Sequence, residues 1–283
     1  MADGGDDSST GGGGVVAGDP TSSSGGDGST TGGGSSGGDS SGVTGGDTSG
    51  EESTGATTSI MPEPTPRLLL MTKTEGYRHD SIPAGISAVQ GICDEQGWEL
   101  TTTEDASLFT DEQLATFTGV MFLSTSGDIL SPEQEAAFRG FVEAGGSFIG
   151  VHAATDTEPG WQWYRELVGA HFHSHPAIQS AQIHVDVADH LATAHLSDPW
   201  LRADEWYNFD VNPRADETVN VLLTLDEGTY MGGNMGDHPI TWTREVGPSR
   251  MFYTALGHTT TSYAEPEFLL HLSGGMRWAL QGR

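Results

Sequence analysis

The sequence predicts an α/β fold in which helices cover a parallel sheet. From Arg67 onward, short apolar runs alternate with segments of helical spacing in the order strand, helix, strand, strand, helix, strand. Elements of these lengths in this order are typical of a parallel sheet with helical crossovers. Because such sheets bind ligands at the carboxyl ends of their strands, the residues that follow each strand are the first candidates for a site.

The first half of this region has the clearer pattern. Strands are predicted at residues 68–71, 98–103, 120–123 and 148–151. Residues 82–96 are predicted to form a helix because apolar side chains recur there at helical spacing. A second helix is predicted to begin at Pro132, to contain Phe138, Phe141 and Val142, and to end before Gly145 and Gly146.

The second half is less regular. Strands are predicted at residues 183–187, 219–225 and 251–256, and a helix over residues 267–280 closes the chain. No internal repeat is visible, so the pattern favours one folded domain over residues 67–283.

Residues 1–66 differ in composition from the rest of the chain. They hold 20 of the 41 glycines and 10 of the 40 acidic residues, and they have no Lys or Arg. Such a segment buries too little apolar area to offset the entropy lost on ordering. We therefore expect a disordered, acidic Gly/Ser/Thr-rich tail or linker, whose end is marked by Pro62, Pro64 and Pro66.

The charge balance excludes several classes of partner. The chain has 40 acidic residues against 11 basic ones, a net charge of -29. Nucleic acids and anionic lipid surfaces are bound through Lys and Arg, so both are poor partners for this chain. The single cysteine, Cys93, excludes an intrachain disulfide and a cysteine-rich zinc site. Its place on the apolar face of helix 82–96 favours a buried, inert thiol.

Localisation follows only from analogy. No apolar run approaches the roughly 20 residues needed to span a bilayer, and no export signal is visible. Acidic Gly/Ser/Thr tethers are common behind cleaved bacterial lipoprotein signals, which favours a tethered or secreted extracytoplasmic protein. The alternative is a cytoplasmic protein with a solubilising tail. The oligomeric state stays open.

All eleven histidines lie in the folded region, and several follow predicted strands. Arg78 and His79 occupy the loop after the first strand, a loop class that carries sites in open α/β sheets. His152 stands among small residues directly after a strand, with the spacing of a nucleophile elbow. An imidazole there could be a general base or a metal ligand; the alternative is a purely structural His hydrogen-bonded under a loop.

Three further histidines lie between residues 171 and 176. Alternate side chains of an extended chain are roughly 6.6 Å apart, too far for two of them to share a zinc ion at about 2.1 Å each. We therefore favour only His175, fixed in orientation by Pro176, as a site residue. His171 and His173 are expected at the surface.

Aromatic and acidic residues gather in later segments. Glu205, Trp206 and Tyr207 are consecutive, and Trp161 lies near Asp156. Rings that stack on sugar faces and carboxylates that bind hydroxyls are typical of carbohydrate sites, whereas the alternative for each ring is core packing. His258 comes just past the strand predicted at residues 251–256, after a glycine.

These segments resemble the ThuA-like (trehalose utilisation) family. The similarity runs in order through residues 77–82, 150–156, 167–172, 175–176, 204–207, 238–242 and 252–258. It implies a flavodoxin-like three-layer sandwich, similar to the class I glutamine amidotransferases, and a role in bacterial carbohydrate catabolism. In those amidotransferases the elbow carries a cysteine that attacks glutamine. Because His152 stands at the elbow here, we expect no glutaminase activity.

Two functions remain open. The first is an enzyme, a lyase, isomerase or hydrolase, acting on a sugar or 3-keto-sugar. In this interpretation the catalytic candidates are His152, His258 and Asp156, and the substrate-binding candidates are Arg78, Trp161, His175, Trp206 and Tyr207. The second is a non-catalytic carbohydrate-binding module on a tethered surface protein.

The candidate residues are expected to converge on one pocket. His79, His152 and His258 each follow a predicted strand, and in a parallel sheet these ends lie at one edge. With Glu205 they would form a ligand set suited to zinc or a similar divalent metal. Without a metal, one His remains a candidate base tuned by Glu205.

Overall fold

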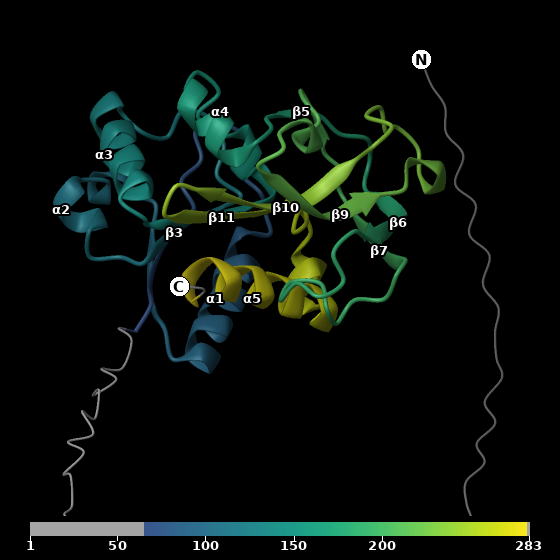
Figure 1. Ribbon diagram of the computed structural model, residues 1–283, viewed down its shortest axis with the longest axis horizontal. Coiled ribbons are helices and arrows are strands. Elements are labelled where there is room, and N and C mark those ends of the chain that lie inside the picture. Colours follow the sequence, from purple (N-terminus) through teal and green to yellow (C-terminus); the bar gives the residue numbers. More distant parts are fainter. Residues whose placement is uncertain (1–64, 282–283) are drawn as a thin grey trace, which may run out of the picture. The chain divides into compact units, whose positions relative to one another are not determined.

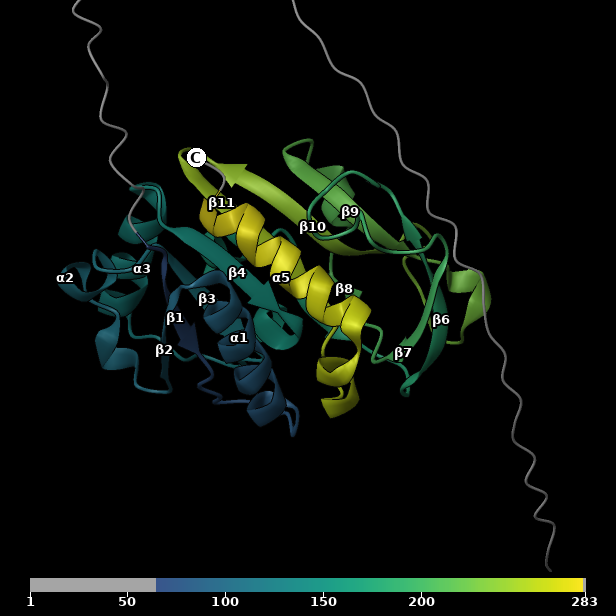
Figure 2. The ribbon, with the colours of Figure 1, turned by 90° about the horizontal axis from the view of Figure 1, so that it is seen from below.

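The computed structural model describes residues 65–281 of the chain. The disordered tail expected over residues 1–66 therefore lies outside the described residues, apart from Thr65 and Pro66. Figures 1 and 2 show a central sheet with α1 (Ile82–Gln96) and α5 (Pro266–Gln281) on one face and α3 (Pro132–Glu143) and α4 (Gln162–Val168) on the other. This three-layer α/β sandwich is the fold class that the sequence predicts.

The main sheet has nine strands within the described residues. In spatial order they are β2 (Glu99–Thr103), β1 (Arg67–Met71), β3 (Gly119–Leu123), β4 (Ser147–Val151), β11 (Ser249–Thr254), β10 (Pro239–Val246), β9 (Val219–Leu225), β6 (Gln179–Val185) and β7 (Trp200–Asp204). The first five run parallel, and the last four extend them with antiparallel pairings. Outside this sheet, β5 (Phe172–Ser174) pairs with β8 (Asn208–Phe209), and α2 (Asp111–Leu114) is a single turn.

The parallel half is built on continuous apolar strands. Every residue of β3 and of β4 is buried, as expected for strands covered on both faces. On one face, Phe138 of α3 packs against Phe122 and Phe148, with ring centroids 5.4 and 5.5 Å apart. On the other face, α5 lies close to β11 because Gly275 has no side chain: a Cβ there would come within 2.3 Å of the Phe252 ring.

The antiparallel half curls back toward the parallel half. Four steps separate β11 from β7 along the sheet, which in a flat sheet would be about 19 Å at roughly 4.8 Å per step. Yet the Asp204 carboxylate, at the end of β7, accepts a hydrogen bond of 2.9 Å from the Gly257 backbone just past β11. Since β7 points the same way as β11 after these reversals, both strand ends lie at one edge of the sheet.

The elements predicted in the first half match the structure closely, whereas several of the second half are new. Helix 82–96 and strand 219–225 have the predicted bounds, while the strand expected at 183–187 begins earlier, at Gln179. The strands β7 and β10 and the helix α4 were not predicted. Within residues 65–281, no helix combines the length and apolar character needed to cross a bilayer.

Candidate functional site

His152 begins a tight 3₁₀ turn, η2 (His152–Asp156), directly after β4, in the manner of an elbow. Its φ of 52° lies in the left-handed region, which is costly for a residue with a side chain. Small neighbours make room for the turn: a Cβ on Gly150 would lie 3.0 Å from the Tyr253 ring and 3.2 Å from the Ala154 methyl group. The elbow thus holds the His152 imidazole in one place, fully buried.

A hydrogen bond at Nδ1, the ring nitrogen that faces away from the cluster, sets the tautomer of His152. Nδ1 lies 2.8 Å from the Ala255 carbonyl oxygen, which can only accept, so Nδ1 carries the proton. In the neutral ring Nε2 then presents a lone pair. This lone pair faces His79 Nε2 and His258 Nδ1, each at 3.1 Å.

His79 and His258 reach this point from loops after two other parallel strands. His79 comes from the loop between β1 and α1, and its ring is edge-on to those of His152 and His258. His258 follows β11 and Gly257, whose φ of 105° lets the chain turn away from the sheet. A hydrogen bond from Ser81 Oγ to the Gly257 carbonyl ties the two loops together.

Glu205 completes the cluster from the far end of the sheet. Its Oε2 lies 3.0 Å from His258 Nδ1 and 3.5 Å from His152 Nε2. Its other oxygen, Oε1, lies 2.9 Å from His175 Nδ1, which also contacts the Pro176 carbonyl oxygen at 2.9 Å. The curl of the sheet, described above, is what carries this carboxylate to the histidines.

Asp204 fixes the backbone on which Glu205 and His258 stand. Its fully buried carboxylate accepts hydrogen bonds from the backbone amides of Gly257 and His258, at 2.9 and 3.1 Å, and forms an ion pair of 3.1 Å with Arg202. Sequence reasoning gave Asp204 no role. The only signal was its position at the end of an alternating segment, which a reader of the sequence cannot connect to Gly257.

The pKa values of the titratable groups in the cluster are shifted in different directions. Burial alone would raise the pKa of Glu205, but its contacts with His152 and His258 outweigh burial and lower the pKa to about 2. Burial, with further repulsion from His152 and His258, lowers the pKa of His79 to about 3. For His258, burial favours the neutral ring, yet the hydrogen bond to Glu205 raises its pKa. The metal-free cluster therefore holds a Glu205 carboxylate beside a His258 that is readily protonated, with His79 neutral.

The same four residues have the geometry of a metal-ligand set. One ligand atom from each of His79, His152, Glu205 and His258 lies within 4.8 Å of all the others. The measured separations of 3.0 to 3.5 Å match the edge of a tetrahedron with bonds of about 2.1 Å, which is roughly 3.4 Å. His152 donates its remaining N–H to a carbonyl, as metal-bound imidazoles do. The donor set of three imidazoles and one carboxylate therefore fits zinc or a similar divalent ion.

Aromatic and exposed groups surround the cluster. The Tyr207 ring lies 4.2 Å from the His152 ring, between centroids, and is itself buried. His175 is 43% exposed at its side chain, and Tyr77, which contacts His79 edge-on at 4.8 Å, is 64% exposed. Of the cluster itself, His258 is the most exposed member, with 17% of its side chain exposed, and His175 and Tyr77 lie exposed beside it.

The other predicted substrate-binding residues are placed differently. Trp206 is buried, packs near Tyr230 and donates its ring N–H to the Gln179 carbonyl, so its ring offers no free face for a sugar. Trp161 packs with Phe138 and Trp163 in the helical layer. Arg78 forms an ion pair of 2.6 Å with Glu104 at the surface. The structure does not bring these three side chains into contact with the histidine cluster.

Three sequence positions remain: His171, His173 and Asp156. His173 is exposed as expected, but the expectation of a surface position for His171 is wrong: its ring is buried because Asp210 holds its backbone amide and Phe172 O contacts Nδ1. Asp156 is half-buried; burial raises the pKa of its carboxyl, and the nearby His171 and His152 lower it.

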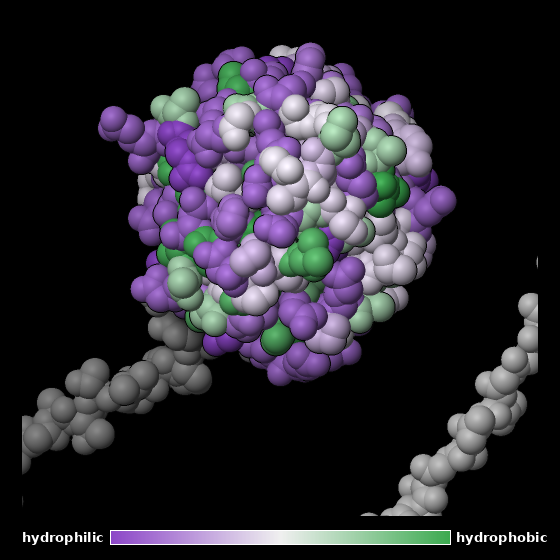
Figure 3. Space-filling model, turned by 90° about the vertical axis from the view of Figure 1, so that its right-hand side faces the viewer, coloured by the Kyte–Doolittle hydropathy of each residue, from purple (hydrophilic) through white to green (hydrophobic). Residues whose placement is uncertain are grey.

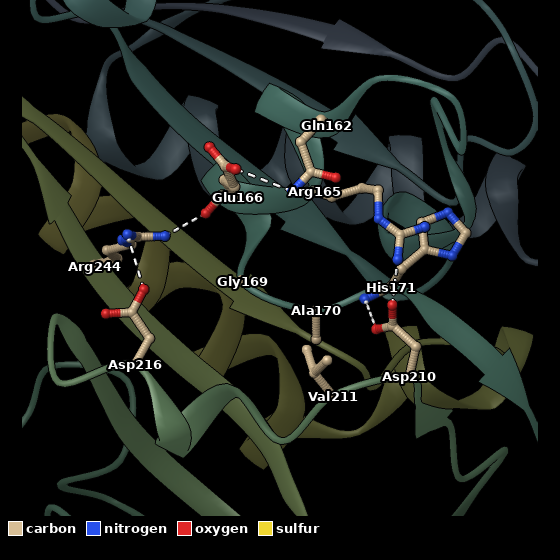
Figure 4. A pocket seen from close by; sticks show the side chains of 10 residues that line it. All are labelled: Gln162, Arg165, Glu166, Gly169, Ala170, His171, Asp210, Val211, Asp216 and Arg244. Carbon is tan, nitrogen blue, oxygen red and sulfur yellow. Dashed lines mark hydrogen bonds and ion pairs between the residues drawn. The ribbon is translucent and has the colours of Figure 1, made fainter.

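His171 also lines a surface cavity of about 420 Å³ (Figure 4). The charged side chains there are already paired, Arg165 with Asp210 and Arg244 with Asp216. The remaining charged group, the Glu166 carboxylate, accepts a hydrogen bond of 3.0 Å from Gln162, so no unpaired cation among the described residues lines the cavity. The histidine cluster, not this cavity, is therefore the candidate site.

Comparison with known proteins agrees with this fold. The model of the family described as ThuA, trehalose utilisation, matches residues 67–279. Among solved structures, a ThuA-like protein from Bacteroides uniformis ATCC 8492 is 25% identical, with a TM-score of 0.66 over 79% of this chain and 95% of that one. A ThuA-like protein from Parabacteroides merdae ATCC 43184 is 19% identical, with a TM-score of 0.64 over 78% and 91% of the two chains.

A cytoplasmic protein from Salmonella typhimurium LT2 shares the fold at 9% identity, with a TM-score of 0.55 over 76% of this chain and all of that one. The comparison with curated proteins gave no match.

Proposed function

The chain belongs to the ThuA family, and we propose that it acts on a sugar or 3-keto-sugar at the His79–His152–Glu205–His258 cluster with the help of a divalent metal such as zinc. The observation that carries this proposal is the convergence of three imidazole nitrogens and one carboxylate oxygen at 3.0 to 3.5 Å. The description of the family, trehalose utilisation, supports a sugar as the substrate class.

In this proposal each residue of the cluster has a defined task. A bound divalent ion supplies Lewis acidity toward a carbonyl or a water. His152 keeps its lone pair directed at the ion because Ala255 holds its proton on Nδ1. His175 holds Oε1 of Glu205 and so leaves Oε2 for the cluster. Tyr77, exposed beside His79, offers a ring on which a sugar can stack.

A reaction at the carbon next to a ketone also needs a base. With the three imidazoles committed to a metal, the base is Asp156, whose burial raises its pKa and makes it a better proton acceptor near neutral pH. Without a metal, His258, less buried than His79 and His152 and paired with Glu205, is the candidate base.

We also propose that the chain has no glutaminase activity. His152 occupies the elbow, and Cys93 is fully buried in α1, where burial raises the pKa of its thiol to about 11. A thiol in this state is neither accessible nor ionised near neutral pH.

The test is turnover of trehalose and 3-keto-trehalose by the full chain, with and without chelator. We expect turnover of the keto-sugar that chelation removes and zinc restores, loss of at least 100-fold in kcat/KM for His79→Ala, and no change for His173→Ala, an exposed His of the same region. Asp156→Asn should lower kcat while the zinc content stays unchanged. Binding of either sugar without any turnover would instead support the carbohydrate-binding module.

A further inference from the structure

A second group of carboxylates lies outside the histidine cluster. Asp128 is in the loop between β3 and α3, Glu135 is in the first turns of α3, and Glu158 follows η2. One oxygen of each lies within 4.8 Å of the others. Asp128 is exposed, Glu135 is half-buried and Glu158 has no exposed surface.

Glu158 is the unusual member of this group. Its Oε1 accepts hydrogen bonds from the backbone amides of Ile129 and Leu130, at 2.9 and 2.8 Å. Its Oε2 is buried and has no hydrogen-bond donor. A buried carboxylate oxygen without a donor is costly, so it requires either a proton or a cation.

The described part of the chain supplies no cation of its own to these residues. No Lys or Arg within residues 65–281 forms an ion pair with any of the three carboxylates. Lys73 reaches the same loop, but its Nζ binds the Ile129 carbonyl at 2.9 Å and Glu75 at 3.2 Å. The amino end of α3 opposes a cation with about half an elementary charge, which is small against three carboxylates.

We propose that Asp128, Glu135 and Glu158 form a calcium site, with Oε2 of Glu158 as its buried ligand and water completing the shell on the side of Asp128. Calcium takes oxygen ligands at about 2.4 Å, so two oxygens on one ion can lie up to about 4.8 Å apart, and one oxygen from each of the three carboxylates lies within that distance of the others. All three donors are carboxylates, the ligands that hard cations select.

The site joins two segments of the chain that the backbone already holds together. Gly127 donates to the Asp156 carbonyl at 2.8 Å, and Glu158 donates to the Gly127 carbonyl at 2.9 Å. A calcium ion would fasten the loop between β3 and α3 to the segment that starts with His152. This proposal is independent of the reaction at the histidine cluster.

The alternative for Glu158 is a shared proton. Burial, with Asp128 beside it, raises the pKa of Glu158 to about 8, so a protonated Glu158 could donate to a neighbouring carboxylate. Glu158→Gln separates the two cases, because its amide supplies a donor in place of the proton but removes the anionic ligand.

The experiment is calorimetric titration of the chelated full chain with Ca²⁺ and, in parallel, Mg²⁺ at pH 7.5, together with thermal unfolding. We expect one Ca²⁺ bound more tightly than Mg²⁺ and a rise in Tm of roughly 5–10 °C at 100 times the Kd. Glu158→Gln should fold, lose the calcium heat and lose the rise in Tm. Glu133→Gln, an acidic residue of the same helix outside the group, should retain both.

The proposal is overturned if the unchanged chain shows no calcium heat and no shift in Tm, or if Glu158→Gln binds calcium as tightly as the unchanged chain. If Glu158→Gln binds as much zinc at the histidine cluster as the unchanged chain does, the loss of calcium is confined to the three carboxylates and the two sites are independent.

Discussion

At the scale of single residues, the site depends on contacts that fix how His152, Glu205 and His258 face the cluster. Ala255 sets the proton of His152 on Nδ1, and His175 holds Glu205 by its outer oxygen. Asp204 does the same for the backbone: it binds the amides of Gly257 and His258 and so sets where His258 stands. These partners are as necessary to the geometry as the four cluster residues themselves.

We predict that Asp204→Asn destabilises the protein by about 3 kcal/mol or more. The substitution keeps the size of the side chain but leaves the buried Arg202 with Glu265 as its one remaining carboxylate partner and puts an amide donor toward backbone donors. The measurement is urea unfolding followed by tryptophan fluorescence. Asp94→Asn, at an exposed position on α1, should change the free energy of unfolding by less than about 0.5 kcal/mol. Equal effects of the two substitutions would contradict the role given to Asp204.

The sequence showed the three histidines of the cluster because each follows a strand of the parallel half. Buried apolar runs mark those strands, and the rule that their ends meet at one edge places His79, His152 and His258 together. Asp204 and Glu205 could not be connected to them in this way. Asp204 ends β7 and Glu205 follows it. This strand alternates buried and exposed residues, and its approach to β11 depends on the curl of four antiparallel strands, which has no local signature in the sequence.

At the scale of elements, α5 packs a buried titratable side chain, His271, against the sheet. His271 is fully buried, donates from Nδ1 to the Ala192 carbonyl at 2.8 Å and lies 3.2 Å from Thr254 Oγ1. Burial lowers its pKa to about 3; the bond to Ala192 acts in the other direction, and Arg202, His195 and His190 lower the pKa further. The ring is therefore neutral in the folded protein at any pH above about 4.

We predict that His271 lowers the free energy of unfolding as the pH decreases. The unfolded chain binds a proton near pH 6.5 while the folded chain does not, so the contribution is complete above pH 6.5 and is lost as the pH falls toward 3. The loss between pH 7 and pH 5 is about 2 kcal/mol. Urea unfolding at both pH values should show a smaller loss for His271→Gln, while His173→Gln, at an exposed position, should keep the full loss. An unchanged loss in His271→Gln would contradict the prediction.

At the scale of the whole molecule, the parallel half provides the site and the antiparallel half closes it. The parallel strands deliver three imidazoles, and the curled extension returns a carboxylate and its supporting aspartate to the same edge. Figure 3 shows the side of the molecule on which β6 and β7 lie, where hydrophobic residues stand singly among polar ones. That face therefore shows no continuous apolar patch of the kind that marks a docking surface.

The measurement that tests the central claim most directly is the zinc content of the full chain after loading and removal of free metal. The account predicts about one tightly held zinc per chain, retained by His173→Ala and absent from His152→Ala, because His152 Nε2 lies within 3.5 Å of a ligand atom of each of the other three residues. Circular dichroism should show that His152→Ala remains folded. If the unchanged chain holds no zinc, or if folded His152→Ala holds as much zinc as the unchanged chain, the cluster is not the metal site that we propose.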